Sequence, residues 1–144
     1  MSDADLVKLY SGQILQLAGS IPHLGRLDHP SGSARLRSPV CGSMIGVDVV
    51  LTDGRITEFA QEVRACALGQ AAASVLGRVV IGRNRPELTQ ARDEVAALLA
   101  ANGPAPQPPF AGFEVLRAAT EYKNRHASVL LALNATIAAI DAAP

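Results

Sequence analysis

The sequence predicts an α+β fold, in which a three-stranded antiparallel sheet packs against about four to five helices. Alternating apolar residues and turn signals are concentrated between residues 34 and 64, whereas helical periodicity runs from Cys66 to the end of the chain. A run of strands followed by a run of helices is typical of a sheet with helices on one face. The chain has 144 residues and is 49% hydrophobic, so we expect residues 1–144 to form a single domain.

Two strands and a tight turn are predicted first. A short strand is expected over Ala34–Pro39, and a stronger one over Met44–Thr52, where apolar residues alternate with their neighbours. The dipeptide Asp53-Gly54 follows directly, and it favours a two-residue hairpin because both residues tolerate positive φ. The pattern therefore predicts an antiparallel meander.

The return strand is expected over Arg55–Arg64. Ile56 and Phe59 fall on opposite faces of a regular strand, so both can be buried only if a β-bulge intervenes. The carboxylates on or near these strands are interpreted as ordinary solvated charges: Asp48, Asp53, Glu58 and Glu62.

The remaining chain is predicted to be helical with two loop-rich segments. Residues 19–33 and the proline-rich stretch 103–109 are expected to be loop and extended connector. Helices are expected over 3–18, 66–81, 86–102, 110–122 and 125–141, with Gly82 and Gly103 following two of them.

Composition excludes several classes of function. Lys and Arg number 13 and so do Asp and Glu, and aromatic residues are only 3%, which argues against nucleic acid and against an anionic membrane surface. No apolar run is long enough for a membrane span. The acidic start, Met-Ser-Asp-Ala-Asp, has no signal-peptide core, so we expect a cytoplasmic protein with reduced thiols.

The two cysteines occupy informative positions. Cys41 lies beside Gly42, between the first two predicted strands, and Cys66 lies where the third strand passes into a helix. A helix N-terminus favours the thiolate, and Arg64 is expected to add to this effect. Because the turn between strands one and two and the end of strand three meet at the same end of a meander, we expect Cys41 and Cys66 to lie close together.

Other readings of these residues stay open. Cysteine is often a buried small hydrophobe, and the spacing matches no short zinc signature such as CxxC. His126, near the start of the last predicted helix, is by itself more typical of a surface or cap residue, and His23 or His29 could take its place as a ligand. No hydrolytic constellation and no phosphate-binding loop is present, so no catalytic residue and no enzyme activity are predicted.

Taken in order, several segments resemble the NifU/IscU-like scaffold family, from about Leu9 to Ile140. They are Leu9-Tyr-Ser11, Pro22-His-Leu-Gly-Arg-Leu27, Pro39-Val-Cys-Gly42, the hairpin at Asp53-Gly54, Arg64-Ala-Cys-Ala67 and the start of the final helix. The resemblance implies a scaffold on which sulfur from a cysteine desulfurase and iron form a [2Fe–2S] cluster, held by three cysteines and an aspartate and then passed to client or carrier proteins. Members of a Suf-linked branch, the SufU-like proteins, bind zinc there and relay sulfur.

The resemblance also implies a set of site residues. The family's first two cysteines fall on Cys41 and Cys66, and its aspartate falls on Ser43. The third cysteine falls on His126, because His126-Ala-Ser-Val stands where the family has Cys-Ala-Thr-Leu. Imidazole suits both zinc and iron, whereas a serine is a poor replacement for a carboxylate and leaves the fourth position open.

We therefore expect a non-catalytic scaffold or carrier that binds an iron–sulfur cluster, iron or Zn²⁺ through Cys41, Cys66 and His126, with Ser43 as a further candidate ligand. Cys66 or Cys41 is expected to carry persulfide sulfur. Two alternatives remain beside this hypothesis: a zinc-bound protein that accepts sulfur from a cysteine desulfurase, and a metal-free interaction module of the same fold. The residues leave the native metal, the clients and the oligomeric state open.

Overall fold

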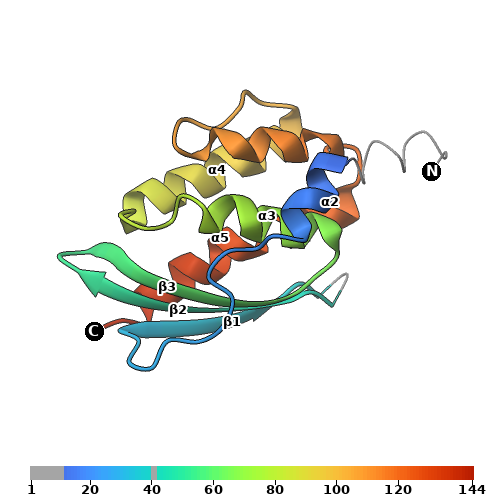
Figure 1. Ribbon diagram of the computed structural model, residues 1–144. Coiled ribbons are helices and arrows are strands. Elements are labelled where there is room, and N and C mark those ends of the chain that lie inside the picture. Colours follow the sequence, from blue (N-terminus) through green and yellow to red (C-terminus); the bar gives the residue numbers. More distant parts are fainter. Residues whose placement is uncertain (1–11, 40–41) are drawn as a thin grey trace.

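The computed structural model describes residues 12–39 and 42–144. A three-stranded sheet forms one layer, and helices cover one of its faces (Figure 1). Helix α5 (His126–Asp141) lies between the sheet and the other helices, because it contacts β1 and β2 on one side and α3 and α4 on the other. Its central place explains why it is apolar on nearly all sides. The predicted α+β class is confirmed.

The sheet has the order β1-β2-β3 and is antiparallel throughout. The strands are β1 (Gly32–Arg37), β2 (Met44–Thr52) and β3 (Arg55–Arg64). The prediction placed the first strand at Ala34–Pro39, two residues too late at each end. Gly32 already pairs with Val49, and its lack of a side chain lets β1 approach the backbone carbonyl of Ala139 in α5.

A bulge in the β2–β3 pair reconciles the apolar pattern of the return strand. Val50 pairs with Glu58 and Leu51 pairs with Ile56, so one residue of β3 is left over between them. Ile56 and Phe59 are consequently both buried. The hairpin at residues 53–54 is also confirmed, and both of its residues have positive φ.

The first two described helices differ from their predicted lengths. Helix α2 is described over Gly12–Ala18, and the earlier part of the predicted helix 3–18 lies outside the described residues. Helix α3 (Ala67–Gly77) ends before the predicted Ile81. The chain leaves the helix because residues 82 and 83 bond to the backbone of Ile56 at the open edge of β3.

The later helices follow the predicted order. Helix α4 (Arg85–Ala101) begins with a capping box of Asn84 and Glu87 and ends at Asn102, which has positive φ. The helix predicted over 110–122 is present, but it is shorter and of the 3₁₀ type, because η1 spans Phe110–Ala119. Its buried residues recur every third position, which places them on one face of a helix with three residues per turn: Phe110, Phe113, Leu116 and Ala119. The short 3₁₀ helix η2 (Lys123–Arg125) then leads into α5.

Among the helices of the described residues, none combines the length and the apolar character that a bilayer span requires.

Candidate functional site

Cys66 occupies the N-cap position of α3, at the end of the sheet where β3 finishes. Its thiol is half-buried and is not part of a disulfide. The Sγ atom lies 3.5 Å from the hydroxyl of Ser128, which belongs to the first turn of α5 and is fully buried. The predicted strand-to-helix position of Cys66 is confirmed, and α5 supplies a partner from 62 residues along the chain.

A second hydroxyl extends this contact toward the β1–β2 connection. Ser43 is buried, and its Oγ lies 3.0 Å from Oγ of Ser128. The side chains of Ser43, Ser128 and Cys66 thus form a continuous series of contacts, and the three residues come from separate elements. We call these three residues the hydroxyl–thiol chain.

The close approach of α3 and α5 at this point depends on a glycine. A Cβ added to Gly69 would lie 2.7 Å from the hydroxyl oxygen of Ser128 and 2.8 Å from Cβ of Ala65. Real side chains do not tolerate such contacts, so any larger residue would push the two helices apart. Gly69 therefore sets the separation at which Ser128 reaches Cys66.

The surroundings of Cys66 favour the thiolate. Burial raises the pKa of its thiol, but a hydrogen bond from Ser128 opposes this effect. The backbone amides of Gly69 and Leu68, at the start of α3, and the side chain of Arg125 also lower the pKa. The net pKa lies below the usual value for a cysteine, because the donors outweigh burial. Arg125 takes the part that the sequence reasoning assigned to Arg64.

The sheet register brings the described ends of the β1–β2 connection to the same end of the sheet as the end of β3. Met44 pairs with Arg37 on one side and with Arg64 on the other. The β1–β2 connection is closed by a hydrogen bond that the backbone amide of Ser38 donates to the carbonyl oxygen of Ser43, at 2.8 Å. Cys41 itself lies outside the described residues, and its role in the site stays a prediction.

His126 has partners of its own at the start of α5. Its Nε2 lies 2.9 Å from the carbonyl oxygen of Ala119 and 3.0 Å from that of Thr120, at the end of η1. Both partners are acceptors, so Nε2 must carry the proton and, in the neutral ring, Nδ1 keeps its lone pair. Among the described side chains it is Ser128, two residues later on α5, that contacts Cys66. The assignment of His126 as a metal ligand remains a prediction.

The two other histidines lie elsewhere. The ring of His23 packs edge-on against Phe59, with ring centres 5.9 Å apart. His29 lines a cavity together with Val50 and Glu58, toward the hairpin end of the sheet. Neither position is at the Cys66 end, so the structure does not support them as substitutes for His126.

The described residues offer a limited set of metal donors. No group of three or more His, Cys, Asp or Glu side chains in residues 12–39 and 42–144 is arranged to hold a metal ion. Near Cys66 the donors are its thiol and the hydroxyls of Ser43 and Ser128. Sequence reasoning missed Ser128, because no local signal marks a serine in the first turn of α5 as the neighbour of a cysteine 62 residues earlier.

The interpretation of Asp48 as a solvated charge was wrong. Asp48 is only 3% exposed, on the sheet face opposite the helices. Its carboxylate accepts hydrogen bonds from Arg26 at 2.7 Å, from the Leu27 amide at 3.0 Å and from Ser33 at 2.6 Å. Burial raises the pKa of this carboxyl, but the bonds from Arg26, Ser33 and Leu27 together lower it below the usual value. Asp48 thus anchors the loop 19–31 where the loop crosses the sheet.

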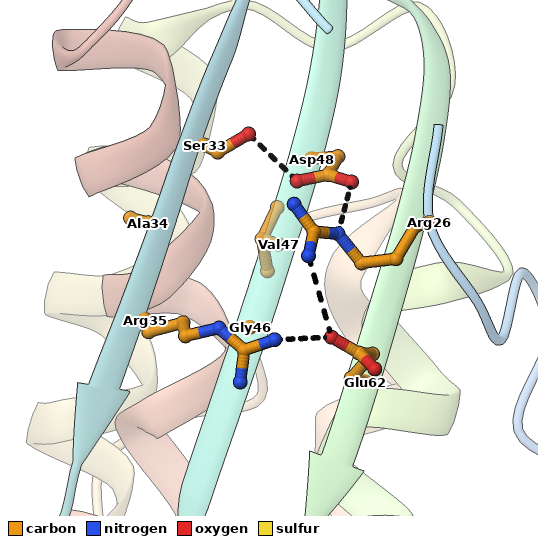
Figure 2. Close-up of a pocket in the computed structure, with 8 residues that line it drawn as sticks. All are labelled: Arg26, Ser33, Ala34, Arg35, Gly46, Val47, Asp48 and Glu62. Atoms are coloured by element: carbon orange, nitrogen blue, oxygen red, sulfur yellow. Dashed lines mark hydrogen bonds and ion pairs between the residues drawn. The ribbon is translucent and has the colours of Figure 1, made fainter. Parts of the chain in front are cut away.

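A cavity of about 300 Å³ lies beside this anchor. Figure 2 shows Arg26 reaching toward both Asp48 and Glu62, while Arg35 of β1 reaches across Gly46 of β2 to meet Glu62 of β3. Each charge of the cavity therefore faces an opposite charge of the chain itself. We interpret this cluster as structural, and we place the candidate functional site at Cys66.

Comparison with known proteins gives the chain a family. A family model described as the NifU-like N terminal domain matches residues 9–129. A crystal structure of a nitrogen-fixing NifU-like protein (N-terminal) from Brucella abortus is 42% identical, with a TM-score of 0.91 and 95% of each chain covered. A search of curated proteins found no match.

Two further solved structures share the fold. One, described as a hypothetical protein, is 25% identical, with a TM-score of 0.79 and coverage of 94% of this chain and 98% of that one. The other is a candidate iron–sulfur cluster assembly scaffold protein for the SUF system of Fervidobacterium islandicum AW-1. It is 16% identical, with a TM-score of 0.83 and coverage of 93% and 98%, and this likeness concerns the fold alone. The match to the family model and the likeness to the Brucella protein show that the chain belongs to the NifU-like N-terminal domain family.

Proposed function

We propose that this protein is an iron–sulfur cluster assembly scaffold or carrier, with the cluster as cargo rather than as a resident cofactor. Membership of the NifU-like family supports this function. In the proposal Cys41, Cys66 and His126 hold a [2Fe–2S] cluster, iron or zinc, sulfur comes from a cysteine desulfurase, and the cluster passes to client or carrier proteins. We place the protein in the cytoplasm, where its thiols stay reduced.

The observation that carries the proposal is the environment of Cys66. Its thiol is half-buried at a helix N-terminus and is hydrogen-bonded to the hydroxyl of Ser128, and the pKa of the thiol is lowered. The thiolate is the form that binds iron or zinc and the form that accepts sulfur. A cysteine that only filled space in the core would need none of these donors.

The proposed ligand set is consistent with the neighbouring groups. A histidine that binds a metal through one nitrogen usually donates the other N–H to a carbonyl or carboxylate. His126 already has this second bond, from Nε2 to the carbonyls of Ala119 and Thr120, which leaves Nδ1 for a metal. Ser43, at the family's aspartate position, is buried against Ser128 and offers only a hydroxyl. A weak fourth donor favours release of cargo over permanent binding.

A second function, a zinc-bound sulfur relay, is favoured by the same lowered pKa of Cys66. In this case the Cys66 thiolate attacks the outer sulfur of a persulfide on the desulfurase. A new S–S bond forms at Cys66, the S–S bond of the donor breaks, and the donor cysteine leaves as a thiolate. The proton of the transferred S–H stays with the transferred sulfur.

Metal analysis of freshly purified protein, followed by anaerobic reconstitution with ferrous iron, cysteine, a cysteine desulfurase and a thiol reductant that converts persulfide sulfur to sulfide, tests both functions. We expect the native protein to show the sulfur-to-iron charge-transfer absorption of a bound cluster. This absorption should be lost in Cys41→Ala, Cys66→Ala and His126→Ala. His29→Ala is the matched control, since His29 lies toward the other end of the sheet. Stoichiometric zinc with iron-independent stimulation of the desulfurase supports the relay instead. If the native protein binds neither metal nor cluster and the cysteine variants behave identically, both proposals fail and the metal-free module remains.

A further inference from the structure

The two outer strands of the sheet differ in how the chain covers them. The outer edge of β3 is covered twice, because the segment 23–25 forms backbone hydrogen bonds with Gln61 and the segment 82–83 forms them with Ile56. Strand β1 forms the lower border of the sheet in Figure 1 and, among the described residues, pairs only with β2. An uncovered edge strand is a template on which a further strand can pair. The edge of β1 is therefore open to another chain.

The register identifies which backbone groups of β1 point away from β2. The amide of Ser38 bonds to the carbonyl of Ser43, and this pair continues the register in which Arg37 lies opposite Met44. Hydrogen-bonded and non-bonded pairs alternate along an antiparallel ladder, so every second residue of β1 directs its N–H and C=O outward. These residues are Ser33, Arg35 and Arg37. Within the described chain, no backbone group outside the sheet bonds to them.

The side chains of β1 alternate between two kinds of surface. The sheet face opposite the helices carries Ser33, Arg35 and Arg37, and all three residues are exposed. The helix face carries Ala34 and Leu36, which are half-buried against the edge of the core. Because neighbouring strands align their side chains face by face, a strand added beside β1 meets cations on one face and apolar side chains on the other.

The positive charge of this face is only partly neutralised by the chain itself. Arg35 forms an ion pair with Glu62, at 2.6 Å. Arg37 has no carboxylate within ion-pair distance in the part of the chain that the structure describes. The register places Met44 beside Arg37 and then Arg64, which has no such partner there either. The face beside the outer half of β1 therefore carries a surplus of positive charge.

We propose that the open edge of β1 is a docking site for an extended segment of a partner protein in which acidic and apolar residues alternate. The segment adds a strand antiparallel to β1, and its carboxylates face Arg35 and Arg37. Its apolar residues continue the row formed by Ala34 and Leu36. Main-chain hydrogen bonds supply the affinity and the alternating side chains supply the specificity. A second copy of this chain is not the expected partner, because its own β1 brings the same arginines and no carboxylate. The proposal is independent of the chemistry at Cys66.

The test uses short fluorescent peptides as probes of this edge and the full chain as the receptor. In each peptide valine alternates with glutamate or with lysine, and fluorescence anisotropy measures the dissociation constant. We expect the glutamate peptide to bind at least about tenfold more tightly than the lysine peptide at about 10 mM salt, where the Debye length is about 30 Å. At about 1 M salt, where that length falls to about 3 Å, the ratio of the two constants should approach one.

Main-chain pairing is tested separately from charge. In an antiparallel added strand the glutamates lie opposite Arg35 and Arg37 and bond to them through their own N–H groups, whereas the valine N–H groups point away. N-methylation of two glutamate amides should therefore abolish binding, and N-methylation of two valine amides should preserve it. Hydrogen exchange followed by NMR locates the contact. The bound peptide should slow exchange at the amides of Ser33, Arg35 and Arg37, but not at those of Ala34 and Leu36, which already bond to β2.

Arg37→Glu should lower the low-salt ratio by more than half, and Arg78→Glu is the matched control. Arg78 is exposed and lacks a carboxylate partner among the described residues, but it follows Gly77, which lies against Gln61 on the side of the covered β3 edge. An equal fall of the ratio in both variants, or equal binding of the two N-methylated peptides, overturns the proposal. Slower exchange at the outward amides of β1 with rising protein concentration, without peptide, assigns the edge to a second copy and overturns it as well.

Discussion

Replacement of Asp48 by Asn should destabilise the protein through the loop that crosses the sheet. The carboxylate is 3% exposed and accepts bonds from Arg26, the Leu27 amide and Ser33. Hydrogen bonds to a buried charge contribute about 1.5–3 kcal/mol each, but Arg26 and Ser33 are exposed and regain water when the charge is removed. The half-buried Leu27 amide cannot do so fully, and we expect a net loss of about 2–3 kcal/mol in the free energy of unfolding.

The same carboxylate makes the stability depend on pH. The pKa of Asp48 is lower in the folded protein than in the unfolded chain, because the hydrogen bonds from its donors outweigh burial. Its contribution is therefore complete above the unfolded value of about 3.9 and is lost as the pH falls through the lower, folded value. We expect the native protein to lose stability over this acidic window, and the Asp48→Asn variant to lack that component.

Urea unfolding followed by circular dichroism, repeated between neutral and acidic pH, measures both effects. Glu62→Gln is the control, because Glu62 also pairs with arginines of this cluster but is 41% exposed. An exposed pair of this kind contributes less than about 1 kcal/mol. Equal losses in the two variants, or a loss under about 0.5 kcal/mol for Asp48→Asn, would refute the anchoring role of Asp48.

Three further predictions concern the Cys66 end. Gly69→Ala should lower the free energy of unfolding by about 1–3 kcal/mol, because the added Cβ collides with Ser128. Gly12→Ala, where the added Cβ meets open space, should be neutral or stabilising, and thermal unfolding compares the two variants. Ser128→Ala, in a Cys41→Ala background, should move the midpoint of the pH–rate profile for alkylation of Cys66 to higher pH, because a donor that lowers the thiol pKa is lost. An unchanged midpoint would contradict this. His126→Ala and His126→Gln should both lose metal on elemental analysis, but His126→Gln, which keeps an N–H donor for the carbonyls at the end of η1, should unfold at a higher temperature than His126→Ala.

The local features of the fold were predictable because each depends on a short stretch of chain. The hairpin follows from Asp53-Gly54, since both residues adopt positive φ without strain. The bulge follows from Ile56 and Phe59, since only an extra residue allows both to be buried. The type of η1 was also present in the sequence as a three-residue spacing of apolar positions, although the prediction over 110–122 named only a helix.

The site was predictable only in part. The position of Cys66 at a strand-to-helix junction is a local property, and the meander brings the described ends of the β1–β2 connection to the same end of the sheet. The hydroxyl of Ser128 was not predictable in the same way, because it comes from a helix 62 residues later. The ligand assignments of Cys41 and His126 still depend on the family resemblance and await the metal analysis.

The sequence alone determined the α+β class, the strand order and the placement of a cysteine at the start of a helix, because periodicity and turn residues act over a few neighbouring positions. The tertiary structure decided which groups surround that cysteine. Ser128 reaches Cys66 only because Gly69 lets two helices come close, and Asp48 is buried only because a loop folds over its strand. Such contacts depend on distances between segments remote in sequence, and packing sets those distances.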